Sequence, residues 1–197
     1  MGDVEGRLAH AATDMIVAQG TGFTMNALIA ASGISRKTVY ARHPNKRALM
    51  EWFVHRMLDI GLEPLAVADG DDWRESLRDF IHRCIVEIHL PQTTALRRIL
   101  ESSPDFLDEV RPRIEQVLAS RFLTPLTAFL DRLAADGRVL SPDTGFVAAT
   151  LINLIVAEAA PPHLGSMGTG PRPIGSADPA DYADRLTRLF CDGIAAR

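Results

Sequence analysis

The sequence predicts an all-α protein of about nine helices, and three observations support that fold class. Apolar residues recur at the three- and four-residue spacing of a helix in nearly every segment. Serine, threonine, asparagine and aspartate stand where these helices would begin, and glycine or proline stands where they would end. No segment shows a convincing strand pattern, and no internal repeat is evident.

The N-terminal sixty residues predict four helices, separated by glycine or proline, over residues 5–19, 25–31, 36–42 and 46–60. Thr24 and Ser35 have the form of N-caps. Apolar residues flank each cap at the two positions of a hydrophobic staple, namely Phe23 with Leu28 and Ile34 with Val39. Two short, capped helices around the glycine turn Ser32-Gly33 are the local geometry of a helix-turn-helix, whose second helix enters the DNA major groove.

Charge is distributed unevenly along the chain. The whole protein carries a net charge of −4, which alone argues against a partner as acidic as nucleic acid. Residues 1–60, however, hold seven Lys/Arg and five Asp/Glu, and five of those seven cations lie between positions 36 and 47. A charge run is usually a solvated face, but this one is interleaved with Thr38 and Tyr40, which also donate hydrogen bonds. The pattern therefore favours DNA binding by this segment.

The remaining chain predicts further helices, over residues 73–90, 93–101, 104–136, 143–160 and 180–195. Pro112 and Pro125 lie inside the third of these, where each is expected to break or kink the helix. Residues 161–179 hold five prolines and four glycines and predict a long loop. We expect a DNA-binding domain at residues 1–50 and a helical regulatory and dimerisation domain at residues 51–197, linked by helix 46–60.

Several classes of protein are not indicated by the sequence. No apolar run approaches the roughly 20 residues that span a bilayer, and the N-terminus does not read as a secretory signal, so we expect a cytoplasmic protein with no membrane partner. Cys84 and Cys191 form no CxxC pair, and His82, Cys84 and His89 lack the spacing that favours one metal ion. No phosphate-binding loop or nucleophile motif is present, so we assign no catalytic residue, no cofactor and no metal.

Four motifs occur together in the N-terminal region: Gly20-x-x-Phe23-Thr24, Leu28-Ile29-Ala30-x-Ser32-Gly33-Ile34-Ser35, Thr38-Val39-Tyr40 and Pro44-x-Lys46-x-x-Leu49. With them, residues 7–53 resemble the TetR family of bacterial transcriptional regulators. Beyond residue 60 only the helical pattern resembles that family. The resemblance implies a homodimer that binds a palindromic operator in double-stranded DNA, and negative regulation relieved by a small molecule.

The resemblance also implies roles for individual side chains. Thr24, Thr38, Tyr40 and Lys46 would hold the DNA backbone, while residues near Arg36 and Lys37 would face bases. Arg36 is the best candidate for reading guanine, because a guanidinium pairs with two acceptors on that base. The full predicted DNA-binding set is Thr24, Ser35, Arg36, Lys37, Thr38, Tyr40, His43 and Lys46.

His43 departs from the family pattern, which usually has a core aromatic, most often phenylalanine, at this position. Histidine could fill that space, or it could turn outward towards a phosphate. Lys37 is a second departure, because many members have glycine there.

An effector cavity in the C-terminal half is also expected, although an ordinary core is the competing interpretation for each residue. The candidate lining residues are Trp73, Cys84, Ile88, Phe122, Phe129 and Asn153. A homodimer needs an apolar, self-complementary interface, and residues 143–160 and 180–195 are the best candidates to form it. A DNA-binding adaptor controlled by a protein partner remains the alternative, and a filled core with an exposed apolar patch would favour it.

Overall fold

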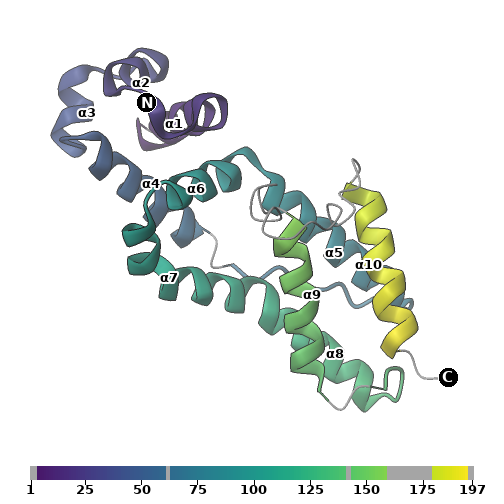
Figure 1. Ribbon diagram of the computed structural model, residues 1–197. Coiled ribbons are helices and arrows are strands. Elements are labelled where there is room, and N and C mark those ends of the chain that lie inside the picture. Colours follow the sequence, from purple (N-terminus) through teal and green to yellow (C-terminus); the bar gives the residue numbers. More distant parts are fainter. Residues whose placement is uncertain (1–3, 61–62, 141–142, 159–178, 195–197) are drawn as a thin grey trace, which may run out of the picture. The chain divides into compact units, whose positions relative to one another are not determined.

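The computed structural model describes residues 4–60, 63–140, 143–158 and 179–194, and the elements within these ranges are all helices (Figure 1). In chain order the elements are α1 (Val4–Gln19), the 3₁₀-helix η1 (Gly20–Gly22), α2 (Met25–Ser32), α3 (Arg36–Arg42), α4 (Lys46–Ile60), α5 (Trp73–His89), α6 (Pro91–Glu101), α7 (Pro104–Leu118), the π-helical segment η2 (Ala119–Leu123), α8 (Thr124–Ala135), α9 (Thr144–Glu158) and α10 (Pro179–Ile194). If the continuous run from α7 to α8 is counted as one, the described ranges hold nine helical rods, and the predicted fold class is confirmed.

The chain forms two compact units, and they do not follow chain order. The first unit combines residues 1–61 with residues 90–115, so α6 and most of α7 belong with the four N-terminal helices. Its core contains the predicted apolar face of α1 and buried residues of α2 to α4, including Leu8, Ile16, Leu28, Val39, Leu49 and Phe53. The functional boundary near residue 50 remains a prediction.

α6 is joined to α1 by a polar contact as well as by packing. The Arg98 guanidinium donates hydrogen bonds to the carbonyls of Ile16 at 2.9 Å and Val17 at 2.6 Å. Both carbonyls lie among the last four of α1, which have no partner within their own helix. Arg98 therefore gives two carbonyls at the C-terminus of α1 a hydrogen-bond donor. Its positive charge also interacts favourably with the negative end of the helix dipole.

The second unit combines residues 62–89 with residues 116–197. α5 packs against α9 and α10, and α8 packs against α9 (Figure 1). One continuous apolar cluster fills the space between them, with Phe80, Ile81, Ile85, Leu126 and Leu130 almost completely buried. α9 covers residues 144–158 of the helix predicted over 143–160, and α10 begins at Pro179, one residue before the predicted start. The predicted loop 161–179 lies outside the described residues apart from Pro179, which opens α10.

The two prolines in the long central run behave differently. α7 continues through Pro112 without interruption, so the predicted break is not found there. Ahead of Pro125 the helix widens into η2, where Thr124 donates its backbone N–H to the Ala119 carbonyl five residues earlier. Proline cannot donate to the carbonyl four residues before it and its ring crowds that carbonyl, which explains the local change of hydrogen-bond pattern.

Candidate nucleic-acid interface

The α2–turn–α3 segment has the predicted caps. The Thr24 hydroxyl accepts a hydrogen bond from the Ala27 N–H at 3.2 Å, and the Ser35 hydroxyl accepts one from the Thr38 N–H at 3.1 Å. Both caps satisfy N–H groups that lack a partner at a helix start. The flanking staple residues are all buried: Phe23, Leu28, Ile34 and Val39.

The turn between the two helices is fixed by its backbone. Gly33 has φ of +62°, a left-handed conformation that side chains with a Cβ adopt reluctantly. The Arg7 guanidinium, from α1, donates to the Ser32 carbonyl at 2.7 Å, and the Ser32 hydroxyl accepts from the Ile34 N–H at 3.3 Å. These contacts hold the angle between α2 and α3, so the orientation of α3 is set by the first unit's own structure.

α3 presents a row of hydrogen-bond donors on one face. Arg36, Lys37 and Tyr40 are all exposed, and their spacing places them on one side of the helix while Val39 faces the core. The Arg36 guanidinium donates to the Asn26 side-chain carbonyl on α2 and lies 5.8 Å from the centre of the Tyr40 ring. Arg36 is therefore held by two neighbours before any ligand is present.

Asn26 was not anticipated from the sequence as part of this surface. It lies in the first turn of α2 and is exposed. The available signal was weak, because an asparagine at a solvent-facing helix position has only low helix propensity to mark it.

The other residues predicted to bind DNA already make contacts within the protein. The Ser35 and Thr38 hydroxyls share a hydrogen bond at 2.7 Å. Lys46 is half-buried at the start of α4, where its ammonium group donates to the Thr21 carbonyl and lies 4.8 Å from the centre of the Phe23 ring. The structure thus places these residues around the N-termini of α3 and α4.

His43 points inward, which answers the question left open by the sequence. The residue ends α3, donating its backbone N–H to the Val39 carbonyl at 2.8 Å, and only 5% of its surface is exposed. Its ring centre lies 4.7 Å from a ring centre of Trp52, and its Nε2 atom has no hydrogen-bond partner. The predicted phosphate contact is therefore removed from the candidate set, because a buried ring cannot reach DNA without leaving the core.

The electrostatic surroundings of His43 favour its neutral form. Burial lowers the pKa of His43 below its usual 6.5, the positive charge of Arg42 lowers it further, and Glu5 acts in the opposite direction. Glu5 lies 3.4 Å from the guanidinium groups of both Arg42 and Arg56, so its charge is shared between two cations. A neutral imidazole behaves here as an aromatic filler of the core.

The candidate effector-lining residues belong to the second unit, and most of them are core. Trp73, Cys84, Phe122 and Phe129 are buried in the apolar cluster, and Ile88 packs against it half-buried. Burial raises the pKa of the Cys84 thiol to about 12, so Cys84 acts as a small apolar group. Four of the six side chains thus form one packed core together with their neighbours.

Asn153, the sixth residue predicted to line an effector cavity, does not lie in this core. The side chain is exposed on α9, next to the buried Ile152. The helix is apolar on almost every side, so its sequence does not reveal which positions face inward.

An open cleft of about 330 Å³ lies in the first unit, between α4, α6 and the start of α7. Its wall includes Lys46, Arg47 and Glu51 from α4, with Ile99 and Phe106 opposite. None of the six predicted effector-lining residues borders this cleft. Arg47 is paired with Glu51 at 2.7 Å, so Lys46 leaves the lining residues with a net charge of +1.

Within the described residues, no group of three or more His, Cys, Asp or Glu side chains is arranged to hold a metal ion. No helix in the described ranges has the length and apolar character required to cross a membrane.

Comparisons with known proteins agree with this geometry. A family model described as bacterial regulatory proteins of the tetR family matches residues 8–51, which span α1 to the first part of α4. A search of curated proteins finds no match.

Solved structures resemble the chain over its full length. A TetR-family transcriptional regulator from Mesorhizobium loti is 19% identical, with 98% of this chain and 97% of that chain covered and a TM-score of 0.65. A TetR transcriptional regulator from Agrobacterium tumefaciens is 14% identical over 98% and 95% of the two chains, with a TM-score of 0.66. GusR of Salmonella enterica is 18% identical over 96% and 94%, with a TM-score of 0.61.

At these identities the structural likeness is one of fold, whereas the family model identifies the N-terminal domain. Residues 8–51 are therefore a domain of the tetR family of bacterial regulatory proteins, and the chain as a whole shares its fold with solved TetR-family regulators.

Proposed function

We propose that this protein is a homodimeric repressor that binds a palindromic operator and is released from it by a small-molecule effector. The observation that carries the DNA-binding part is the donor row of α3. Arg36, Lys37 and Tyr40 face solvent on a helix whose start is capped and whose angle is fixed by the Gly33 turn. A rigid helix with exposed donors is what insertion into the major groove requires.

The contacts divide into two kinds. Arg36 and Lys37 are proposed to read base edges, and Tyr40, Thr24, Thr38 and Lys46 to hold phosphates. Capping does not prevent this, because the Thr24 hydroxyl accepts from Ala27 and keeps its own O–H to donate. Lys46 would exchange the Thr21 carbonyl for a phosphate oxygen, a stronger, charge-assisted partner.

The homodimer is proposed to form through α9 and α10. The exposed large apolar side chains of these helices, in their described parts, are Phe146, Leu154, Val156 and Leu189. A two-fold interface needs such a self-complementary apolar patch. Because the dimer accounts for these side chains, they do not require a protein partner of another kind.

The effector is proposed to enter the second unit between the core residues around Trp73, Cys84, Phe122 and Phe129. These side chains are packed against one another, so a ligand would have to replace contacts within the core. A ligand that does so binds one arrangement of the unit better than another, which is the requirement for changing DNA affinity at a distance.

Replacing Lys46 with alanine is expected to weaken binding to all DNA sequences alike. Loss of one phosphate contact should reduce the slope of log affinity against log salt concentration by about 1. Fluorescence anisotropy on a labelled duplex at several salt concentrations measures both quantities. Arg132→Ala removes the same charge from the second unit and serves as the control. An unchanged slope in Lys46→Ala would show that this contact is absent.

Replacing Arg36 with alanine is expected to relax specificity at one base pair and to cost about 1–3 kcal/mol on the preferred sequence. Selecting sites from random DNA with the variant, beside the wild-type protein, gives the preference at each position. Asn26→Ala is the companion variant, because it removes the hydrogen-bond partner of Arg36 and keeps Arg36 itself. It should weaken the base preference at the same position. Recovery of an identical motif with Arg36→Ala would rule out the proposed role.

The proposal as a whole is tested by selection from random duplex DNA with the full-length protein. We expect one sequence family to be enriched, and a reporter gene placed behind that sequence to be less active when the protein is present. Failure to enrich any sequence would contradict DNA recognition, and a more active reporter would contradict repression.

A further inference from the structure

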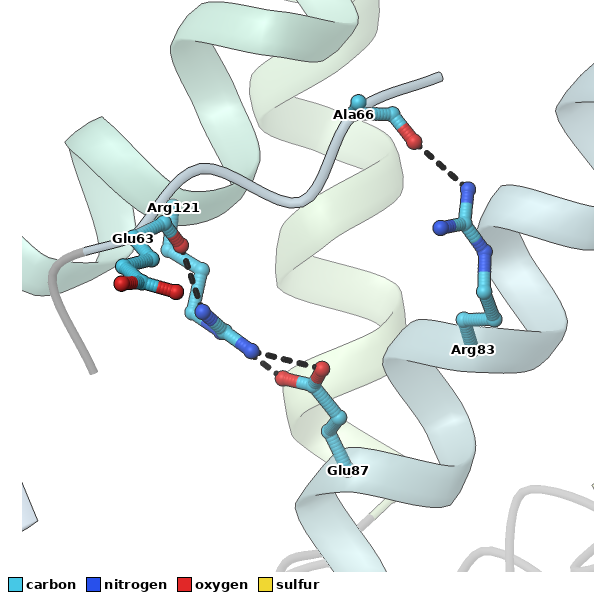
Figure 2. Close-up of polar contacts among 5 residues, drawn as sticks. All are labelled: Glu63, Ala66, Arg83, Glu87 and Arg121. Atoms are coloured by element: carbon cyan, nitrogen blue, oxygen red, sulfur yellow. Dashed lines mark hydrogen bonds and ion pairs between the residues drawn. The ribbon is translucent and has the colours of Figure 1, made fainter. Parts of the chain in front are cut away.

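The segment after α4 has no regular secondary structure from Glu63 to Gly70, yet its backbone is firmly held. The Arg121 guanidinium donates to the Glu63 carbonyl, and the Arg83 guanidinium donates to the Ala66 carbonyl at 2.6 Å (Figure 2). The Leu65 N–H donates to the Arg121 carbonyl at 2.8 Å. Irregular backbone needs such partners wherever water does not supply them. We call Arg83, Glu87 and Arg121 the linker clamp.

Glu87 fixes the central member of the clamp. Its two carboxylate oxygens accept from Nε of Arg121 at 2.8 Å and from Nη2 at 2.7 Å, a two-pronged ion pair visible in Figure 2. The two side chains are only 21% and 25% exposed, and the pair raises the pKa of Arg121. A partly buried pair with this geometry is more specific and stronger than an exposed one.

The Arg121 carbonyl is available to the linker because of Pro125. In a regular helix that carbonyl would accept the N–H of residue 125, but proline has none. The chain widens into η2 at this point, and the Arg121 carbonyl accepts the Leu65 N–H. The helix irregularity and the linker contact therefore have one cause.

Each clamp residue is a sequence neighbour of a residue that the sequence predicts to line an effector cavity. Arg83 precedes Cys84 and Glu87 precedes Ile88 on α5, and Arg121 precedes Phe122 in η2. Cys84 and Phe122 are buried in the core cluster, and Ile88 packs against it. A change of core packing that moves these side chains must also move the backbone that carries the clamp.

The clamp is next to α4 in the chain. Glu63 is three residues beyond Ile60, the last residue of α4. We propose that the linker clamp is the element that transmits the state of the second unit's core to α4, with Arg121 and Glu87 as positioning residues. The inference rests on the proposed function for its regulatory meaning.

Amide hydrogen exchange of the full-length protein tests the clamp without DNA or effector. In Arg121→Met we expect residues 63–67 to exchange at least about tenfold faster, with faster exchange also in residues 52–60 at the end of α4. Glu87→Gln, a milder change, should act in the same direction. Arg185→Met is the matched control: it breaks the ion pair with Asp181 on α10 in the same unit and should leave both segments unchanged.

The outcomes are distinct. Unchanged exchange in residues 63–67 would show that the clamp does not hold the linker. Faster exchange there with α4 unaffected would overturn the transmission role, as would uniform acceleration that includes residues 147–156 of α9. On the selected operator, Arg121→Met should change DNA affinity at least about fivefold. If the wild-type protein selects no DNA, the proposed function fails while the exchange experiment still decides the link to α4.

Discussion

Replacing Phe146 and Leu189 together with arginine is expected to convert the protein into a monomer and to weaken operator binding at least about 100-fold. The two side chains are 68% and 64% exposed, so their replacement should change the free energy of unfolding of each protomer by only about 0.5 kcal/mol. In the proposed dimer each substitution occurs twice and places unpaired charge in an apolar interface. Losing the second half-site contact removes the gain from binding both half-sites at once.

Analytical ultracentrifugation gives the oligomeric state, and anisotropy on the selected operator gives the affinity. Leu140→Arg is the matched control, because Leu140 is equally exposed at 68% but lies between α8 and α9. The control should remain dimeric and bind as the wild type does. If the double variant still sediments as a dimer, the interface lies elsewhere on the protein.

Replacing His43 with phenylalanine is expected to raise the free energy of unfolding by about 1–3 kcal/mol and to make the protein less sensitive to acid. The gain at neutral pH comes from removing Nε2, a buried polar atom with no partner. Phenylalanine is an aromatic ring of similar shape, and the site already packs a ring against Trp52.

The pH dependence follows from the direction of the pKa shift. The pKa of His43 is lowered in the folded protein, so below pH 6.5 the unfolded chain takes up a proton that the folded chain does not. Stability is therefore unaffected by this group above that pH and falls as the pH decreases, by up to about 1.4 kcal/mol per pH unit, until the folded form also protonates. In the wild-type protein the charge would enter a core near Arg42, with Glu5 as the counter-charge.

Urea unfolding at pH 7.5 and pH 5.5 measures both effects. The loss of stability between the two pH values should be smaller in His43→Phe than in the wild type. His10→Gln is the control, since His10 is 80% exposed and paired only with Asp14, and it should leave the difference unchanged. An equal loss of stability in wild type and His43→Phe would show that His43 is not the acid-sensitive group.

Local signals predicted the parts of this protein that depend on near neighbours in sequence. Thr24, Ser35 and Gly33 act within four residues of themselves, so the caps and the turn could be expected, and the structure confirms them. The helical periodicity gave the elements to within a few residues. The change of hydrogen-bond pattern ahead of Pro125 follows from the missing N–H, although the helix continues through Pro112 without interruption.

Features that depend on contacts between distant segments were not predictable in this way. The sequence left the direction of His43 open, because only the packing of α3 against Trp52 decides it. Arg98 contacts α1 across about eighty residues, and Arg121 reaches Glu87 across thirty-four. Neither pair leaves a local pattern, so the mixed composition of the first unit and the linker clamp appear only in the folded structure.

The central claim is that two α3 helices, related by a two-fold axis, read successive major grooves of one operator. The most direct measurement is the arrangement of half-sites in sequences that the full-length protein selects from random DNA. The account predicts an inverted repeat whose half-site centres are about 10 base pairs apart, or a whole number of turns apart. A single asymmetric motif, or no enriched motif, would contradict it.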